Sequence, residues 1–461
     1  MSHRNRKSKR KNNEFEGLQI INPKAAGIDL GSESHYVCLP GNGSVEERVR
    51  EFKTDTPSLK EMSGWLEEAG VTTVAMESTG VYWVPLYEVL DAAGFEVVLS
   101  DTRTISNVPR RKTDVLDCQW IQQLHACGLL SGAFRPADSI VKYRSLVRMH
   151  STLTEKSADW LRRIQKELDQ MNIRVHRAVS DITGATGMRM LHAIVDGERD
   201  PAKLAELRDP RCQRSREEIE RELTGNWRDE HLFNLEQCLE MYEFLLQRIA
   251  KLEEKILKLL SENQTTSEPP PPPPSKAKKN MMSKRGEEPL RESLYKMAGV
   301  DLTSIDTIGV GTAQTILSEI GPDVTMFPSE KHFISYMRLA PGMSVSGGKA
   351  IRGKKTKPQL GSSRARQALT MAALSAGKTN TALGAYYRNV ARRRGPGIAV
   401  FATARKLAQY IYRLLRFGTE YVDIGVEEYE RRNYDRRMKT LKARARQMGY
   451  HLVPFEEPAN A

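Results

Sequence analysis

Long apolar runs and paired cysteines are both missing from this sequence. No stretch approaches the roughly 18–20 consecutive apolar residues of a membrane span, and the first residues lack the apolar core of a secretory signal. The 5 cysteines are odd in number and form no Cys-x-x-Cys pair, which argues against a disulfide framework or a zinc ribbon. We therefore expect a cytoplasmic protein without membrane partners. Its 461 residues are enough for two to four domains of roughly 100–200 residues each.

Acidic residues are absent from one long segment. No Asp or Glu occurs between Glu330 and Glu420, while residues 331–419 carry 18 Lys and Arg. The whole chain has a net charge of +13, so without this segment it would be slightly acidic. Charge segregated in this way indicates a polyanionic partner such as a nucleic acid. A merely solvated surface is the plain alternative, and a membrane surface is a weaker one because no long basic helix with a bulky apolar face is evident.

Composition and periodicity divide the chain into six parts. We expect a basic disordered tail at 1–20, an α/β domain at 21–139, a helical or coiled-coil region at 140–262, a Pro-rich linker at 263–289, a mainly α-helical domain at 290–425 and a charged C-terminal tail at 426–461. The consecutive prolines Pro269–Pro274 favour an extended, semi-rigid spacer. Apolar residues at helical spacing over Leu235–Leu260 predict a long helix, in either a coiled coil or a buried bundle.

Strand and helix patterns alternate in the α/β domain. We expect strands at Ala25–Leu30, His35–Leu39, Glu46–Phe52, Val71–Met76 and Phe95–Ser100, and helices at Pro57–Ala69, Trp83–Ala93 and Asp114–Cys127. Three strands are thus followed by alternating helices and strands. This order predicts an RNase H-like domain, a mixed sheet flanked by helices.

Four carboxylates in this domain form a candidate metal site. Asp29 lies inside an apolar strand, where an unpaired charge costs several kcal/mol, roughly, and Glu77 ends a second buried strand. Asp114 and Asp117 share a helix face with Cβ atoms roughly 5–6 Å apart. Four converging carboxylates suit two Mg²⁺ ions about 3.5–4 Å apart, as in phosphodiester chemistry, and Lys112 could meet a phosphate. Each acid also has a local explanation, as a turn residue, a helix cap or a charge at a positive helix end.

The second domain contains a glycine-rich turn and a basic loop. Gly309 and Gly311 in Ile305–Ala313 are typical of a helix-hairpin-helix turn, in which backbone N–H groups approach a phosphate; an ordinary helix–helix turn is the alternative. Further on, Ser346 lies in a Gly-rich loop. The basic residues that follow it are Lys349, Arg352, Lys354, Lys355, Lys357, Arg364 and Arg366. From composition alone, a phosphate-binding loop with an inert serine is the simpler interpretation, because a hydroxyl needs a base or a metal to become a nucleophile.

Two sets of motifs resemble one protein family. GIDLGSESHYV, AMESTGVYWVPLYEVL and RRKTDVLDCQWI resemble the DEDD transposases of bacterial insertion sequences, whose N-terminal domain is RuvC-like. A second set of motifs resembles the C-terminal serine transposase domain of the same family. This set consists of SGGK, Arg352-Gly353, Gly361, Arg366, Tyr386/Tyr387, Arg394-Gly395, Ala399 and ARKLAQYIYRLL. The resemblance implies that Asp29, Glu77, Asp114 and Asp117 bind divalent metal. One departure is Cys118, where alanine is more usual.

The resemblance also implies a mechanism and partners. A serine in the Gly-rich loop, Ser346 by position with Ser344 as runner-up, would attack DNA and form a phosphoserine intermediate. The resemblance further implies a multimer guided by a structured RNA that pairs with donor and target DNA, and Leu235–Leu260 would join the subunits of a dimer or tetramer near the nucleoid. Two alternatives remain: a metal-only nuclease of the Holliday-junction-resolving kind, in which the serine loop merely binds DNA, and a non-catalytic DNA-binding protein.

Overall fold

The chain forms two compact units, residues 1–135 and 136–461, and each is considered by itself. The computed structural model describes residues 18–41, 43–78, 80–100, 113–130, 132, 134–273, 275–340, 345–346, 349–350, 364–418 and 424–453. Most of the expected tail at 1–20 lies outside this described part of the chain.

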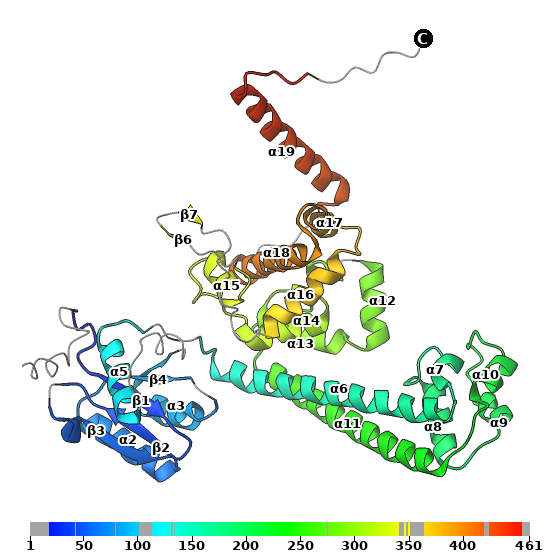
Figure 1. The fold of residues 1–461 in the computed structure, drawn as a ribbon, viewed down its shortest axis with the longest axis horizontal. Helices are drawn as coiled ribbons and strands as arrows, with labels where there is room; N and C mark the ends of the chain where they lie inside the picture. Colours follow the sequence, from blue (N-terminus) through cyan, green and yellow to red (C-terminus); the bar gives the residue numbers. More distant parts are fainter. Residues whose placement is uncertain are drawn as a thin grey trace, which may run out of the picture. The chain divides into compact units, whose positions relative to one another are not determined.

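The first unit is built on a five-stranded mixed sheet (Figure 1). Its strands are β1 (Ala25–Leu30), β2 (Ser34–Cys38), β3 (Val49–Lys53), β4 (Thr73–Glu77) and β5 (Glu96–Ser100). They lie in the order β3-β2-β1-β4-β5. The pairs β1–β2 and β2–β3 are antiparallel, whereas β1–β4 and β4–β5 are parallel. The helices are α1 (Val45–Arg48), α2 (Thr56–Glu68), α3 (Trp83–Ala92) and α5 (Asp114–Ala126). A mixed α/β N-terminal domain is therefore confirmed.

Alternate residues of the central strands face two different cores. Ile28 and Met76 pack in a cluster with buried leucines of α2 and α3. Ala75, one position earlier than Met76, packs against Trp120 and Ile121 of α5. Because successive side chains of a strand point to opposite faces, α2 and α3 cover one face of the sheet and α5 covers the other.

The third strand begins later than the sequence pattern predicts. Ser44 caps helix α1: its hydroxyl accepts from the Glu47 amide at 3.3 Å, and the Glu47 carboxylate accepts from the Ser44 amide at 2.9 Å. This reciprocal capping box stabilises one helical turn, so β3 starts only at Val49. The expected strand at Glu46–Phe52 is wrong in its first half for this reason.

The second unit is mostly helical, as expected. Its longer helices are α6 (Asp138–Gln170), α8 (Ala185–Val195), α11 (Asp229–Glu262), α12 (Lys276–Arg285), α13 (Glu288–Ala298), α14 (Val310–Ile320), α16 (Arg364–Ala376), α17 (Ala382–Arg394), α18 (Pro396–Phe417) and α19 (Val426–Gln447). Shorter elements are α7 (Val175–Ala178), α9 (Pro201–Glu206), α10 (Arg216–Leu223), η1 (Leu302–Ser304), α15 (Glu330–Tyr336), β6 (Val345–Ser346) and β7 (Lys349–Ala350). No helix in the described residues is long and apolar enough to cross a membrane.

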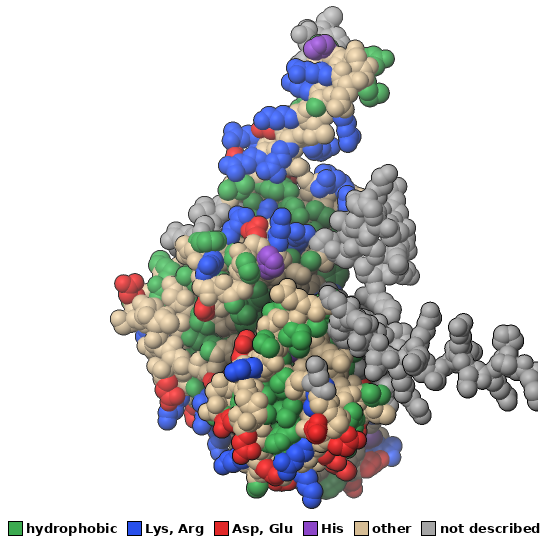
Figure 2. Space-filling view, turned by 90° about the vertical axis from the view of Figure 1, so that its left-hand side faces the viewer, with side chains coloured by type: hydrophobic (Ala, Val, Ile, Leu, Met, Phe, Trp, Pro, Cys, Tyr) green, Lys and Arg blue, Asp and Glu red, His purple; other side chains and the backbone are tan. Residues whose placement is uncertain are grey.

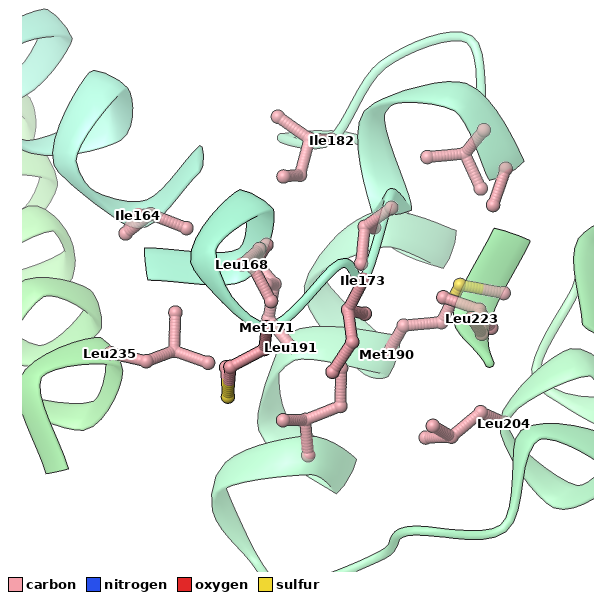
Figure 3. Close-up of a cluster of buried hydrophobic side chains, with 14 of the residues drawn as sticks. Ile164, Leu168, Met171, Ile173, Ile182, Met190, Leu191, Leu204, Leu223 and Leu235 are labelled. Carbon is pink, nitrogen blue, oxygen red and sulfur yellow. The ribbon is translucent and has the colours of Figure 1, made fainter. Parts of the chain in front are cut away.

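Helices α6 and α11 pair along their lengths in an antiparallel hairpin (Figure 1). Two polar contacts mark the register: His150 Nε2 lies 3.0 Å from a Glu253 carboxylate oxygen, and His231 Nδ1 lies 2.8 Å from one of Glu167. At the tip of the hairpin the end of α6 packs with α7–α10 and the start of α11 in one apolar core (Figure 3). That core contains Leu168, Met190 and Leu235.

The apolar face of α11 is occupied inside the chain. The long helix expected over Leu235–Leu260 is present, and Leu235, Leu239 and Tyr242 on it are buried. The stripe that was expected to join subunits is therefore covered by α6 and α8 of the same chain. The large apolar side chains left exposed on this helix are Phe233, Met241, Phe244 and Leu246.

The Pro-rich segment contains an unexpected helix. Residues 276–285, expected to lie in an extended spacer, form α12. Ser275 caps its start, with its side chain accepting from the Lys278 amide at 3.2 Å, and Gly286 closes its end in the left-handed conformation at φ 63°. Both are ordinary helix boundary signals.

The C-terminal segment expected to be a charged tail contains the helix α19. None of its 22 residues is buried, and Figure 2 shows Lys and Arg side chains gathered along it at the top of the view. Its first turns pack on α17, where Tyr429 meets Tyr386 edge to face with ring centroids 6.4 Å apart.

Candidate active site

The parallel pairing of β1 and β4 brings Asp29 beside Glu77. Ile28 is paired with Met76, so the next residue of each strand is an acid. Ile28 and Met76 face α2 and α3. Because successive side chains of a strand point to opposite faces, Asp29 and Glu77 face α5. Both acids are half-buried.

Helix α5 supplies the other two acids from its first turn. Thr113 caps the helix and accepts from the Leu116 amide at 3.3 Å. Asp114 and Asp117 follow at the positive end of the helix dipole, which favours carboxylates. Asp114 is exposed and Asp117 is half-buried.

The close approach of α5 to β1 depends on Gly27. A Cβ at this position would lie 2.2 Å from the Gln122 backbone nitrogen and 2.6 Å from the Cys118 carbonyl oxygen. Cys118 itself is buried, and its thiol donates to the Val115 carbonyl at 3.1 Å. Its role is therefore packing of α5 against the sheet, next to Asp117 in the sequence.

Two further polar side chains fix α5 on the sheet. Gln122 Nε2 donates to the Ala25 carbonyl at 3.1 Å. Arg48 at the end of α1 donates to Gln122 Oε1 at 3.3 Å and to the Leu39 carbonyl at 2.9 Å. These bonds connect β1, β2 and α1 to the helix that carries Asp114 and Asp117.

The four acids interact electrostatically around Asp29. Burial, followed by the charges of Asp117, Asp114 and Glu77, raises the pKa of Asp29 to about 6, against a backbone hydrogen bond from Leu30 that lowers it. Among the described residues, the charged groups that shift the pKa of Asp29 are all carboxylates, so none of them compensates its charge. A bound cation would provide that compensation.

The four carboxylates are suitable ligands for a hard divalent cation, although their oxygens do not converge on a single position. Carboxylate oxygens are the ligands that Mg²⁺ prefers. Within the described residues no three His, Cys, Asp or Glu side chains lie close enough to hold one ion directly. The interactions that raise the Asp29 pKa act over longer distances than metal coordination, so the two findings are compatible.

In the second unit, Gly309 and Gly311 lie at the start of α14. Gly309 caps the helix, and a Cβ at either glycine would meet nothing within 4 Å. Packing against the described part of the chain thus does not require glycine at these positions. Thr307, two residues earlier, adopts φ 64°, and its buried hydroxyl has no hydrogen-bond partner among the described residues. A β-branched residue in the left-handed region is strained, which is typical of functional turns.

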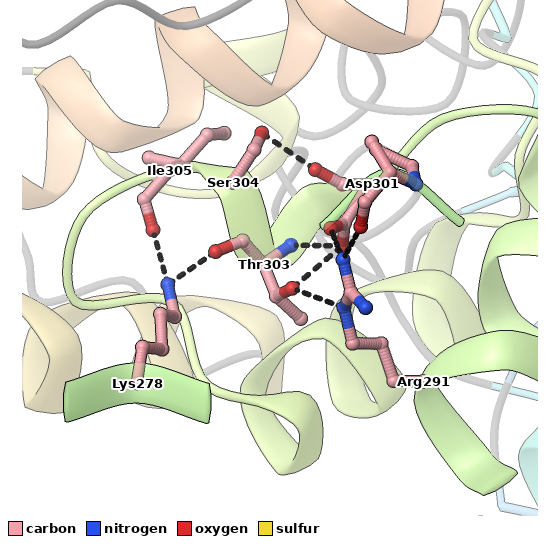
Figure 4. A network of polar contacts seen from close by, with 7 residues as sticks. Lys278, Arg291, Asp301, Thr303, Ser304 and Ile305 are labelled. Atoms are coloured by element: carbon pink, nitrogen blue, oxygen red, sulfur yellow. Dashed lines mark hydrogen bonds and ion pairs between the residues drawn. The ribbon is translucent and has the colours of Figure 1, made fainter. Parts of the chain in front are cut away.

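A buried polar network holds the approach to this turn (Figure 4). Arg291 of α13 pairs with Asp301 at 2.5 Å and donates to the Thr303 hydroxyl at 3.1 Å. Lys278 of α12 donates to the carbonyl of Thr303 and, at 3.2 Å, to that of Ile305. Helix α12 is therefore anchored to the chain that leads into Gly309.

The predicted serine loop is described only in part. Ser346 ends β6 and Lys349 begins β7, and the two pair in a short antiparallel ribbon where a loop was expected. Arg364 begins α16, and the Arg366 guanidinium lies 5.1 Å from the centre of the Phe401 ring. The remaining predicted contacts, Lys112, Ser344, Arg352, Lys354, Lys355 and Lys357, lie outside the described residues.

Comparison with known proteins identifies the family. Residues 26–173 match a family model for IS110-type DEDD transposases, described as "Transposase", and residues 299–388 match "Transposase IS116/IS110/IS902 family". The two matches together cover more than half of the chain. It belongs to the IS110 family of transposases. The first match contains all four acids, and the second contains Gly309 and Ser346.

This IS110-family chain is similar over part of its length to a protein of an insertion element. The similar protein is the insertion element IS110 uncharacterized 43.6 kDa protein of Streptomyces coelicolor, 34% identical over 130 residues. The match covers 27% of this chain and 31% of that protein. Helices α12 and α19 lie outside both family matches.

Three positioning residues of the candidate site were not predicted from the sequence. Gly27, Arg48 and Gln122 determine where α5 lies, yet they carry no catalytic chemistry of their own. The run Ala25-Ala26-Gly27 before Asp29 contained a signal, because glycine within a strand often marks a close approach of another backbone. The Arg48–Gln122 bond joins residues 74 apart in sequence, and no local pattern indicates it.

Proposed function

We propose that this chain is the transposase of an insertion sequence, cutting and rejoining DNA at a site built from metal-binding carboxylates and a serine. The observation that carries the proposal is the set of three carboxylates whose charges raise the pKa of Asp29. Membership of a transposase family supports DNA as the substrate.

Asp29, Glu77, Asp114 and Asp117 would hold two Mg²⁺ ions. Divalent ions bound there would lower the pKa of an attacking oxygen and stabilise the leaving oxygen of a phosphodiester. Asp29 would have the largest role in this arrangement, because it is half-buried on the central strand β1 and its charge is opposed by the other three acids. Gly27 and Gln122 keep α5 in place and so position Asp117.

Ser346 is the proposed nucleophile, on the resemblance to the family. Its hydroxyl would lose a proton and form a new P–O bond, while a backbone P–O bond breaks and the leaving oxygen takes up a proton. Lys349 and Arg352 would neutralise the phosphate. The open glycines Gly309 and Gly311 would hold the DNA backbone nearby without reading its sequence. A structured guide RNA and a dimer or tetramer are part of the proposal on the same resemblance.

A serine variant separates this proposal from a metal-only nuclease. The substrate is a supercoiled plasmid carrying the element with its flanking DNA, and the readouts are strand cleavage and a covalent protein–DNA adduct. We expect Ser346→Ala to abolish the adduct and Ser344→Ala, its matched control, to retain it. Full cleavage by Ser346→Ala with no adduct from the wild type would instead establish the metal-only nuclease, which the carboxylate set in the first unit favours as the second candidate.

An acid variant separates catalysis from plain DNA binding. Asp117→Asn should abolish cleavage and leave plasmid binding intact, with Asp91→Asn on α3 as a control that changes neither. Equal behaviour of both variants, with no cleavage by the wild type, would make the protein a non-catalytic DNA binder. Sequencing the RNA that copurifies from the host tests the guide, since recovery of no discrete RNA contradicts it.

A further inference from the structure

Lys406 on α18 lies in an unusual electrostatic environment. Its half-buried ammonium group lies 4.7 Å from the centre of the Tyr386 ring and 5.9 Å from that of Tyr410. Burial lowers the pKa of Lys406, and the charges of Arg436 on α19 and Arg413 on α18 lower it further. No carboxylate compensates Lys406 in the described part of the chain.

Three helices create this environment together. Tyr386 comes from α17, Lys406 from α18 and Arg436 from α19. The edge-to-face contact of Tyr386 with Tyr429 docks α19 at this point. Of the cations here, Arg413 is paired with Glu330 at 3.0 Å. Within the described residues, Lys406 and Arg436 remain as positive charges that repel each other, an arrangement that an anion would relieve.

The rest of α19 extends the positive charge away from this point. All four acids of the helix lie in its first half, and Glu428 there pairs with Arg431 and Arg432 at 2.6 Å each. From residue 436 onward the helix has 6 basic residues and no acid. Arg436, Lys439, Lys442 and Arg446 are spaced by three, three and four residues, which places them on one face.

Like charges at this spacing destabilise an isolated helix. All four of these side chains are exposed, and no residue of the helix is buried. Neither packing nor ion pairing with the described residues therefore accounts for the second half of α19. A polyanion lying along the basic face would stabilise it.

We propose that Lys406, Arg436 and the basic face of α19 (Lys439, Lys442, Arg446) bind the phosphate backbone of a DNA duplex. The inference rests on the proposed function, since it takes DNA as the substrate, and it adds a contact surface outside the two family matches. The 22-residue helix is about 33 Å long and about 10–12 Å across. Such a helix fits the major groove of B-DNA, about 12 Å wide, but not the deep, narrow major groove of an RNA duplex.

The test compares two charge-neutralised variants of the full chain. One carries Lys439→Gln, Lys442→Gln and Arg446→Gln on α19. The control carries Lys251→Gln, Lys255→Gln and Lys258→Gln, which removes the same charge from exposed positions of α11. Binding to a DNA duplex from the element end and to an RNA duplex of the same sequence is measured over a series of salt concentrations.

We expect the α19 variant to bind the DNA duplex at least ten-fold more weakly, roughly, with a salt slope lower by about 0.9 for each phosphate that the variant no longer neutralises. The control should bind like the wild type. Lys406→Met, which keeps a long apolar side chain against the two tyrosines, should also weaken binding without lowering the melting temperature.

Other outcomes overturn the inference. An α19 variant that binds DNA with unchanged affinity and salt slope removes the surface from the proposal, and equal weakening in the control makes the effect one of net charge. RNA binding that is as tight as DNA binding and weakened alike contradicts insertion into a B-form groove. Plasmid cleavage by the wild type and the α19 variant, with equal DNA binding, overturns this inference alone. DNA binding through α19 without any cleavage by the wild type overturns the proposed function alone.

Discussion

Gly27 on β1 lies so close to α5 that a Cβ would fall 2.2 Å from the backbone nitrogen of Gln122. This contact sets the distance between the strand that carries Asp29 and the helix that carries Asp117. The candidate site therefore depends on a residue that has no side chain.

Gly27→Ala should displace α5 and disable the site. The added methyl has to push backbone atoms of Gln122 and Cys118, and overpacking of this kind costs about 1–3 kcal/mol. We expect a lower melting temperature of the first unit and loss of plasmid cleavage. Gly64→Ala on α2 is the matched control, since nothing lies within 4 Å of its Cβ and alanine favours a helix by about 0.5–1 kcal/mol. A Gly27→Ala protein with full stability would contradict the close approach.

Asp29→Asn should change how stability depends on pH in metal-free protein. The pKa of Asp29 is about 6 in the folded chain, against 3.8 for an ordinary Asp. The folded state therefore holds the proton more tightly, and the stability that this proton contributes is greatest below pH 3.8 and is lost as the pH rises through 6. The loss at neutral pH is about 1–2 kcal/mol after allowance for solvent screening.

Denaturant titrations in chelator at several pH values measure this effect. The asparagine variant should lack the decrease in stability between about pH 4 and 7, and Mg²⁺ should stabilise the wild type more than the variant. Equal pH profiles for the two proteins would show that Asp29 is not held in repulsion with the other acids.

Lys278→Met should release α12 from the chain that leads into Gly309. The ammonium group donates to the Thr303 and Ile305 carbonyls, and leaving such acceptors unpaired costs about 1–3 kcal/mol. Hydrogen–deuterium exchange of residues 276–285 should become faster, whereas Lys279→Met, at an exposed neighbour, should leave it unchanged. Unaltered exchange in Lys278→Met would mean that α12 is held by other contacts.

Glu319→Gln should loosen the connection between α14 and α6. Glu319 is buried and accepts two bonds from Arg148, at 2.9 and 2.8 Å. Glutamine keeps the length but loses the charge and one acceptor, so we expect a loss of about 1–2 kcal/mol. Thermal unfolding measures it, with Glu254→Gln on the exposed side of α11 as the control. A destabilisation no larger than that of the control would assign the pair no structural role.

Much of the first unit follows from local patterns. The apolar strands, the amphipathic helices and the acids on them were predictable, because a strand has a period of two and a helix one of 3.6 residues. The start of β3 was misjudged although Ser44 and Glu47 have the spacing of a capping box, a signal that outweighed the strand pattern.

Helix α12 could not have been predicted in the same way. Apart from its two methionines and an alanine, the segment Lys276–Arg285 is polar and lysine-rich, and it follows a run of prolines. Lys278 on this helix donates to carbonyls 25 and 27 residues away, and Met282 is buried. Such a contact depends on the tertiary fold and leaves no periodic trace in the sequence.

The pairing of Ile28 with Met76 has a consequence for how this protein can diverge. A one-residue slip of a strand sends every side chain to the opposite face. Deleting or inserting one residue within β1 ahead of Ile28 would place the Asp29 carboxylate in the hydrophobic core between the sheet and helices α2 and α3. Related sequences should thus keep the number of residues in β1 ahead of Asp29 constant, and keep glycine at the position of Gly27.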